Sequence, residues 1–327
     1  MVDKKSKKRY FFIVIFIFRC KDSNFFVENA YICPVFIDYY QMKRFFAAFF
    51  CTIAIACSLV SCNGMSSSVP EPVVFESFSI DSVCPLFYNY DNPACHISIM
   101  MEKPSASNSP SLVAALESSL SALPREGSLA EYAGGSLEGM AKAYVRQFFF
   151  QYLLDGKEAI DSYNGDEEAA ATWMNYEERV TGSVLYNSDG FVCYQYNIYS
   201  YAGGAHGNTQ IRNCVFDCKL KRSLALCDIF SAESYPLVSQ KIRQQLMKQY
   251  DCASLDELSG KSFFDPEKIS VTENFLIDED GMSWLFDPYE IAAYAMGEIS
   301  VRLSWHDLKP LILEESPLYD LADQYDV

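Results

Sequence analysis

Residues 187–201 read NSDGFVCYQYNIYSY, a tight turn followed by an alternating strand. Asp189-Gly190 favours the left-handed backbone of a short hairpin turn, so residues 182–186 and 191–201 should pair across it. Side chains at every second position of a strand share a face, and one face of this strand is apolar: Val192, Tyr194, Tyr196 and Ile198. The pattern predicts a hairpin within a sheet that packs against helices.

Other strand-like segments lie on both sides of this hairpin. Residues 73–80 and 96–100 alternate upstream of it, and residues 209–216 follow it. A second hairpin is expected over residues 274–286, with Asp278-Glu279-Asp280-Gly281 as its turn, followed by a strand over residues 299–303. The acidic turn lacks the spaced oxygen ligands and the distal glutamate of an EF-hand loop, so a plain turn is preferred to a calcium site.

Apolar residues recur at helical spacing in three segments. The first begins near Leu112, the second covers residues 137–154 and is expected to stop at Gly156, and the third covers residues 236–250. Pro236 suits the first turn of that helix, and the Ser304 hydroxyl can cap a final short helix.

A short basic and then apolar segment precedes Leu59-Val60-Ser61-Cys62. It begins at an internal Met42, and its apolar stretch is too short to be interpreted first as a membrane-spanning helix. The pattern resembles the lipobox of bacterial lipoproteins, in which the cysteine is linked to diacylglycerol and the chain is cut just before it. Cys62 is therefore the predicted lipidation site, with an uncleaved signal-anchor helix as the alternative.

The predicted lipidation site divides residues 1–72 into three segments. Residues 1–41 are interpreted as an over-extended N-terminus, with a genuine extension as the alternative, and residues 42–61 as a signal peptide. Residues 62–72 are small, polar and Pro-containing, so we expect a flexible tether. The sequence predicts a protein of the bacterial cell envelope, periplasm-facing and attached to a membrane through acyl chains on Cys62.

Processing at Cys62 leaves a strongly acidic chain. Nine of the 26 Lys and Arg and four of the 43 Asp and Glu lie in residues 1–61, which leaves 17 basic against 39 acidic residues and a net charge near −22. Such a surface repels nucleic acid and anionic membrane faces, so nucleic acid is excluded as a partner. It can attract a basic protein, and the alternative is that the acidic charge only keeps the protein soluble.

Seven cysteines follow the anchor, and an odd number leaves at least one free thiol in an oxidising compartment. Cys84 and Cys95 flank a turn-rich stretch and are the candidates for a disulfide. Cys214 and Cys218 have a spacing that fits neither a redox pair nor a zinc knuckle, so they are interpreted as buried apolar residues. No metal and no cofactor are expected.

A glycine-rich loop, Tyr201-Ala202-Gly203-Gly204-Ala205-His206-Gly207, connects two of the predicted strands. Paired glycines permit backbone angles closed to other residues, and they let a ligand or another backbone approach closely. The candidate binding residues are Tyr201, Gly203, Gly204, His206 and Gly207. The alternative is that these glycines only form a tight turn.

This loop opens a distinctive order of segments. Phe216-Asp217, LCDIF at residues 226–230, a helix, an Asp-Gly hairpin and FDPYEI at residues 286–291 follow it. The order resembles the extracellular C-terminal domain of RsiV, a lysozyme-sensing anti-sigma factor. The same domain, domain of unknown function 3298, accompanies peptidoglycan deacetylases of the PdaC type. The resemblance covers residues 184–312, and it departs from the family where residues 219–222 read KLKR in place of a Gly-Lys turn.

The resemblance implies an α+β fold of antiparallel sheets packed with helices, in two adjoining subdomains. It places an N-terminal α+β partner domain over residues 73–180 and the RsiV-like C-terminal domain over residues 181–315. Residues 316–327 are expected to form an acidic tail.

No catalytic set is evident in the sequence. Its three histidines lie in separate segments, and there is no H-x-x-x-H pair of the carbohydrate-esterase type. The resemblance and the anchor therefore predict a non-enzymatic envelope protein that binds a cell-wall polymer, peptidoglycan, or a wall-degrading enzyme such as lysozyme. Two alternatives stay open: a hydrolase or esterase that uses His206 with Asp217 or Asp228, and a purely structural envelope lipoprotein.

Overall fold

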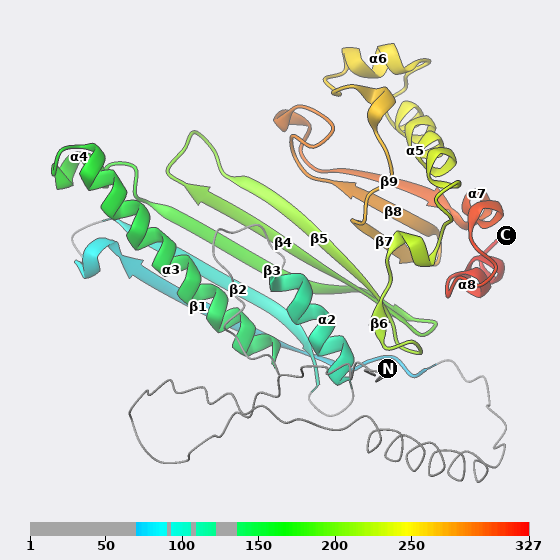
Figure 1. Ribbon diagram of the computed structural model, residues 1–327, viewed down its shortest axis with the longest axis horizontal. Helices are drawn as coiled ribbons and strands as arrows, with labels where there is room; N and C mark the ends of the chain where they lie inside the picture. Colours follow the sequence, from blue (N-terminus) through cyan, green and yellow to red (C-terminus); the bar gives the residue numbers. More distant parts are fainter. Residues whose placement is uncertain (1–69, 90–92, 106–108, 122–135, 327) are drawn as a thin grey trace, which may run out of the picture. The chain divides into compact units, whose positions relative to one another are not determined.

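The computed structural model describes residues 70–89, 93–105, 109–121 and 136–326, and the described chain has an α+β fold (Figure 1). The prediction of an α+β fold in two adjoining parts is confirmed. A six-stranded sheet has the order β1-β2-β3-β4-β5-β6, and a three-stranded sheet has the order β7-β8-β9. Cys62 and the segments assigned to the extension and the signal peptide lie outside the described residues.

The strands of the large sheet are β1 (Phe75–Pro85), β2 (Ala94–Pro104), β3 (Tyr176–Ser188), β4 (Phe191–Ala202), β5 (Asn208–Asp217) and β6 (Arg222–Ser223). Those of the small sheet are β7 (Phe275–Asp278), β8 (Gly281–Phe286) and β9 (Ile299–Ser304). The α-helices are α2 (Pro110–Ser121), α3 (Leu137–Ser162), α4 (Glu167–Ala171), α5 (Tyr235–Gln249), α6 (Leu255–Gly260), α7 (Trp305–Leu308) and α8 (Tyr319–Gln324). Short 3₁₀ turns cover Leu86–Tyr88, Leu226–Asp228, Pro266–Lys268, Tyr294–Met296 and Lys309–Leu311.

The predicted hairpin of residues 182–201 forms the centre of the large sheet, as β3 and β4. Its apolar face, with Val192, Tyr194, Tyr196 and Ile198, packs in one core with α2 and α3, as predicted. Both tyrosine hydroxyls in this core form hydrogen bonds. Tyr194 donates to the Glu102 carbonyl at 2.6 Å, and Tyr196 donates to the Leu116 carbonyl at 2.9 Å. Buried hydroxyls with partners avoid the penalty of an unsatisfied polar group.

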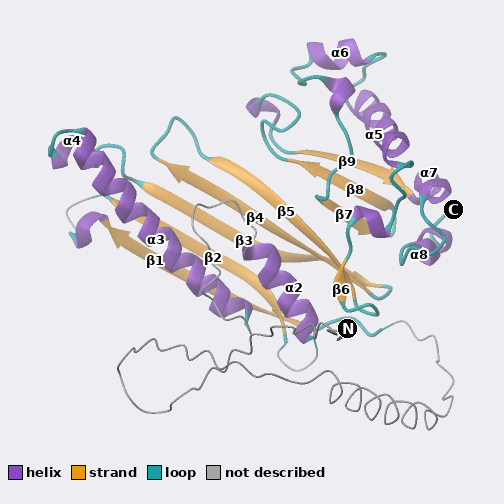
Figure 2. Cartoon of the chain, in the orientation of Figure 1, coloured by secondary structure: helices purple, strands orange, loops and turns teal. Residues whose placement is uncertain are grey.

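The opposite face of β4 contributes to a second core. Phe191 and Cys193 pack there with Val215 of β5, with α5 and with the small sheet, whose Trp284 is fully buried. Figure 2 shows α2 and α3 beside the large sheet and α5 beside the small one. The large sheet is therefore shared between two cores, one on each face.

One pairing differs from the expected antiparallel arrangement, because β2 and β3 run parallel. Parallel neighbours need a long crossover connection, and here it contains α2, α3 and α4. The alternating pattern of residues 96–100 predicts a strand but carries no information on its direction.

Helix α3 does not stop at Gly156, contrary to the sequence prediction, but continues to Ser162. A Cβ at residue 156 would lie 2.4 Å from Leu86 Cδ1. Gly156 is therefore a close-packing position inside the helix and not a C-terminal signal, since it lets α3 approach the buried Leu86.

Two predicted segment boundaries fall within packed structure. Strand β3 crosses the expected division at residues 180/181, so the large sheet takes strands from both sides of it. Residues 316–326, expected as an acidic tail, contain α8, and Leu318 and Leu321 are buried in the core of the small sheet. Among the described residues, none of the helices combines the length and the apolar composition that crossing a membrane requires.

Candidate functional site

The loop between β4 and β5 approaches the rest of the molecule closely at two glycines. Gly203 has a φ of 76°, and a Cβ there would lie 1.9 Å from the Trp173 carbonyl oxygen. A Cβ on Gly207 would lie 2.4 Å from the ring of Tyr199. Gly204 has more space, since its nearest neighbour would be 3.9 Å away. Two of the three predicted glycines are thus needed for close approach.

The ring of His206 is oriented by the loop itself. Its Nδ1 lies 2.9 Å from the carbonyl oxygen of Gly207. Because a carbonyl oxygen only accepts hydrogen bonds, this contact assigns the proton of the neutral ring to Nδ1 and leaves the lone pair on Nε2. The side chain is exposed, so the loop presents an imidazole with its basic nitrogen available to a ligand.

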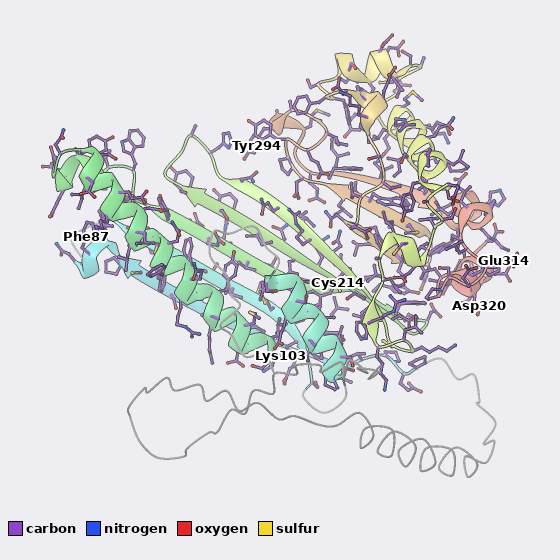
Figure 3. The ribbon with its side chains drawn as sticks, in the orientation of Figure 1. Phe87, Lys103, Cys214, Tyr294, Glu314 and Asp320 are labelled. Carbon is purple, nitrogen blue, oxygen red and sulfur yellow. The ribbon has the colours of Figure 1, made fainter. Side chains whose placement is uncertain are left out.

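Two tyrosines from the segment after β8 complete a stack with His206. The ring centroids of His206 and Tyr294 are 4.1 Å apart at an interplanar angle of 23°, and those of Tyr294 and Tyr289 are 5.2 Å apart at 29°. The Tyr294 hydroxyl donates to the Gly207 carbonyl at 2.7 Å, which joins the two segments. Figure 3 shows Tyr294 on the loop between β8 and β9.

Tyr289 also borders an open cleft of about 700 Å³. One wall comes from β5, one from the residues just before β7, and one from the segment after β8. Its lining is mostly hydrogen-bonding side chains: Ser119, Asn208, Gln210, Arg212, Asn213, Thr272, Glu273, Asn274, Asp287, Pro288, Tyr289 and Glu290. The volume lies within the usual range of ligand sites.

Side chains hold the walls of the cleft together by bonding the free edge of β5. The backbone N–H of Ile211 donates to Asp287 Oδ1 at 2.7 Å, and that of Asn213 donates to Asn274 Oδ1 at 3.0 Å. Asn274 Nδ2 donates in turn to the Ile211 carbonyl at 3.0 Å. These bonds replace a neighbouring strand, so the edge of β5 serves as a fixed wall.

Charges in the cleft are mainly acidic. Asp287 pairs with Arg212 at 2.5 Å between Oδ2 and the guanidinium. Burial, reinforced by the negative charge of Asp287, raises the pKa of Glu290 above its ordinary value. The Asp287 N–H donates to Glu290 Oε2 at 2.8 Å, which opposes that rise. Glu290 is thus a carboxyl group that keeps its proton to higher pH than an ordinary glutamate.

None of the five predicted loop residues is among those that line the cleft. The loop reaches the cleft through Asn208, which directly follows Gly207, and His206 lies beside it through its ring contacts with Tyr294 and Tyr289. Tyr201 lies in β4 opposite Glu177. It takes no part in the described contacts of the aromatic stack.

Neither aspartate proposed as a partner of His206 is beside it. Asp217 stands at the far end of β5, nine residues from Asn208, or roughly 30 Å at the rise of a strand. It is buried and accepts from the N–H groups of Lys219 and Leu220, which supports the turn where the sequence departs from the family pattern. Asp228 pairs with Arg222. Both aspartates are structural, so the pairing of His206 with Asp217 or Asp228, considered above as an alternative, is not formed.

Cys84 and Cys95 are direct partners in the antiparallel β1–β2 register. Both are buried thiols in this structure, and the Cys95 Sγ donates to the Cys84 carbonyl at 3.5 Å. Burial raises the pKa of Cys95 to about 12, so it is a poor nucleophile as a thiol. The disulfide stays a prediction.

Sequence reasoning missed most of the cleft. Tyr289 and Glu290 lie in the family motif at residues 286–291, and Tyr294 follows it by three residues, so this motif is the signal that could have indicated them. The roles of Arg212, Asn213 and Asn274 depend on contacts between β5 and segments some 60 to 75 residues away, which no local pattern reveals. Across the described ranges, histidine, cysteine and carboxylate side chains do not form a group of three or more that could hold a metal ion.

Comparison with known proteins divides the chain into two matched regions. Residues 89–209 match the family described as Deacetylase PdaC, and residues 227–306 match the family described as Protein of unknown function (DUF3298). Peptidoglycan-N-acetylmuramic acid deacetylase PdaC of Bacillus subtilis (strain 168) is 30% identical over 152 residues, which are 46% of this chain and 32% of that protein. The chain thus spans about a third of the length of this relative.

Two crystal structures share the fold. A member of the DUF3298 family from Bacteroides fragilis superposes with a TM-score of 0.67 at 22% identity, over 77% of this chain and 98% of that one. A DUF3298 family protein from Pseudomonas aeruginosa PAO1 gives a TM-score of 0.56 at 17% identity, over 76% and 98%. At these identities the likeness concerns the fold alone.

These matches contradict the prediction of a non-enzymatic binding protein. No catalytic set is evident in the sequence, yet the curated relative is named as a deacetylase and the matching family model carries the same name. Both names point toward a hydrolase, the alternative given above, and the name of the relative alone refers to peptidoglycan. The chain thus contains a region that matches the DUF3298 family, preceded by a region that matches the PdaC family.

Proposed function

We propose that this protein is a hydrolase that removes acyl groups from peptidoglycan, with His206 as its general base. The observation that carries the proposal is the orientation of the imidazole, whose Nδ1 is bonded to the Gly207 carbonyl beside a cleft of about 700 Å³. The deacetylase name of the Bacillus subtilis relative supports the class of reaction and of substrate. The matched region covers only about a third of that relative. The activity proposed for this chain therefore rests on the geometry of its own site, and the relative supports only the class of reaction.

The proposed step uses two groups of the chain. His206 Nε2 accepts a proton from water, and the water oxygen forms a bond to the acyl carbon. The bond from that carbon to the sugar nitrogen or oxygen then breaks, which releases a carboxylic acid and leaves an amine or a hydroxyl on the sugar. Glu290 lines the cleft that His206 lies beside, and its raised pKa suits it to protonate the leaving atom.

Acetate release tests this proposal directly. Purified protein is incubated with insoluble peptidoglycan, and free acetate is measured over time. We expect release by the wild-type protein and a loss of about 100-fold or more in His206→Gln, in line with the usual contribution of a general base.

His306→Gln is the matched control, because His306 is exposed and pairs with Asp326 away from the cleft. It should release acetate at the wild-type rate. Absence of acetate release by the wild-type protein, or equal rates in wild type and His206→Gln, would contradict the proposal.

We also propose that acyl chains on Cys62 hold the protein to a membrane of the bacterial envelope, which would keep the site close to the wall. The Leu59-Val60-Ser61-Cys62 sequence supports this. Metabolic labelling with palmitate in a bacterial host should mark the wild-type protein and not Cys62→Ser. Equal labelling of both proteins would exclude this anchor.

A further inference from the structure

Tyr289 combines two properties that packing alone does not explain. Its backbone has a φ of 71°, a left-handed conformation that is unfavourable for a bulky residue. Its side chain is nevertheless 55% exposed, so the conformation does not serve to bury the ring. A strained residue at the rim of a cleft is a reason to look for a ligand contact.

The ring of Tyr289 is held in place from behind. It stacks on Tyr294, whose ring stacks in turn on His206 and whose hydroxyl is bonded to Gly207. The stack fixes the orientation of Tyr289 while leaving more than half of its side chain accessible. This is an aromatic surface that is ordered before any ligand binds.

The neighbouring walls provide the polar half of a saccharide site. Amide and hydroxyl side chains from three segments line the cleft, among them Asn208, Gln210 and Thr272. Asn213 Nδ2 is buried in the wall without a hydrogen-bond partner within the described residues. Planar amides bond sugar hydroxyl and acetamido groups through donors and acceptors together.

The negative charge of the cleft favours a neutral glycan over a stem peptide as its ligand. Glu273 and Asp287 face a single cation in the lining, Arg212, so the cleft has an excess of negative charge even when Glu290 is protonated. Free carboxylates of a peptide are disfavoured there, whereas a neutral N-acetylated sugar carries no such penalty.

We propose that Tyr289 is the platform on which a pyranose ring of an N-acetylated glycan stacks, with the amides of the β5 wall bonding its substituents. This subsite rests on the proposed function, since it names the part of peptidoglycan that the same cleft takes. Tyr289 is therefore the residue that sets specificity for the glycan strand over the peptide stem.

Binding without turnover tests the subsite. The probe is the tetramer of N-acetylglucosamine, titrated calorimetrically into the full-length Glu290→Gln protein, which lacks the proposed acid and keeps the stack of His206, Tyr294 and Tyr289. Tyr289→Phe in that background should bind the tetramer with an affinity within about threefold of that of the parent protein. Tyr289→Gly should weaken binding roughly tenfold or more, the scale of a lost ring stack. The glycine variant removes the backbone strain together with the ring, so it is expected to fold like its parent.

Tyr163→Ala is the control for loss of an exposed tyrosine, because Tyr163 lies at the C-terminal end of α3, outside the cleft lining. It should bind the tetramer like its parent. Unchanged affinity in Tyr289→Gly, no binding by the parent protein, or preferential binding of a stem tripeptide would overturn the subsite. Binding with this pattern but no acetate release by the wild type would overturn the hydrolase and leave the subsite standing.

Discussion

At the residue scale, two adjacent glycines in the β4–β5 loop have different structural roles, which the sequence alone does not distinguish. Gly203 faces the Trp173 backbone with a left-handed φ, whereas Gly204 has space for a methyl group. We expect Gly203→Ala to lower the free energy of unfolding by about 2–4 kcal/mol, from overpacking against backbone and from strain. Gly204→Ala should change it by less than about 0.5 kcal/mol.

Urea unfolding of the two glycine variants measures this difference. Because His206 is oriented by Gly207 within the same loop, Gly203→Ala should also reduce acetate release, and Gly204→Ala should not. Equal stability of the two variants would show that the close approach to Trp173 is not a constraint on the loop.

Glu290 gives a second prediction at this scale, about pH. A carboxyl group whose pKa is raised in the folded protein contributes stability below its unfolded pKa, and this contribution is lost as pH rises through the folded pKa. Glu290→Gln mimics the protonated form. Its free energy of unfolding, compared with that of the wild-type protein, should therefore be higher at pH 8 than at pH 4.5. Denaturant unfolding of both proteins at the two pH values measures this difference. The control for removal of one carboxylate is Glu314→Gln, at an exposed residue (Figure 3).

If Glu290 acts as the acid, its raised pKa also appears in the pH dependence of acetate release. Wild-type activity should fall on the alkaline side as Glu290 loses its proton. A Glu290→Gln protein with a wild-type rate at every pH would remove this residue from the chemistry.

At the element scale, α3 shows why one helix boundary was predicted wrongly. Glycine commonly follows the last turn of a helix, so Gly156 was interpreted as a stop. Its tertiary role, contact with Leu86 of the β1–β2 connection, depends on a neighbour 70 residues away. The helix start was predictable, by contrast, because Ser136 caps it locally by accepting from the Gly139 N–H.

The contact between Gly156 and Leu86 is testable by adding one methyl group. Alanine gains about 1 kcal/mol over glycine in helix propensity, but its Cβ would overlap the buried Leu86 side chain, at a cost of about 1–3 kcal/mol. We expect Gly156→Ala to be net destabilising, by up to about 2 kcal/mol, in thermal or urea unfolding. Gly260→Ala, at a helical glycine with no neighbour within 4 Å, should be neutral or slightly stabilising. Stabilisation by both substitutions would contradict the packing argument.

At the scale of the whole molecule, the sequence predicted the strands and most helices but little of the site. Local alternation and turn residues are sufficient for β4, β5 and the β7–β8 hairpin, since each depends on neighbours in the chain. The loop of His206 was predicted because glycine and histidine cluster within seven residues. The cleft was not, because its walls meet only after β5 packs against the segments around β7 and β8.

That junction should also determine how the described chain unfolds. Both sheets share a core on one face of β4, and Asn274 bonds β5 to β8 through Ile211, Asn213 and the Leu285 carbonyl. Asn274→Ala leaves the Asn213 N–H and the Ile211 carbonyl without this partner, so we expect a loss of about 2–4 kcal/mol. The exposed Asn208→Ala, on the same cleft, should cost less than about 0.5 kcal/mol.

Because the shared core remains in Asn274→Ala, its unfolding should stay a single transition at a lower urea midpoint, seen alike by tryptophan fluorescence and far-ultraviolet circular dichroism. Trp284 reports on the small sheet, whereas the dichroism signal includes the long strands of the large one. Two separated transitions would mean that the sheets fold independently, and the cleft between β5 and β7 would then be a hinge and not a fixed wall. A single transition supports a preformed site, because the residues that line it could be displaced only by unfolding the core that both sheets share.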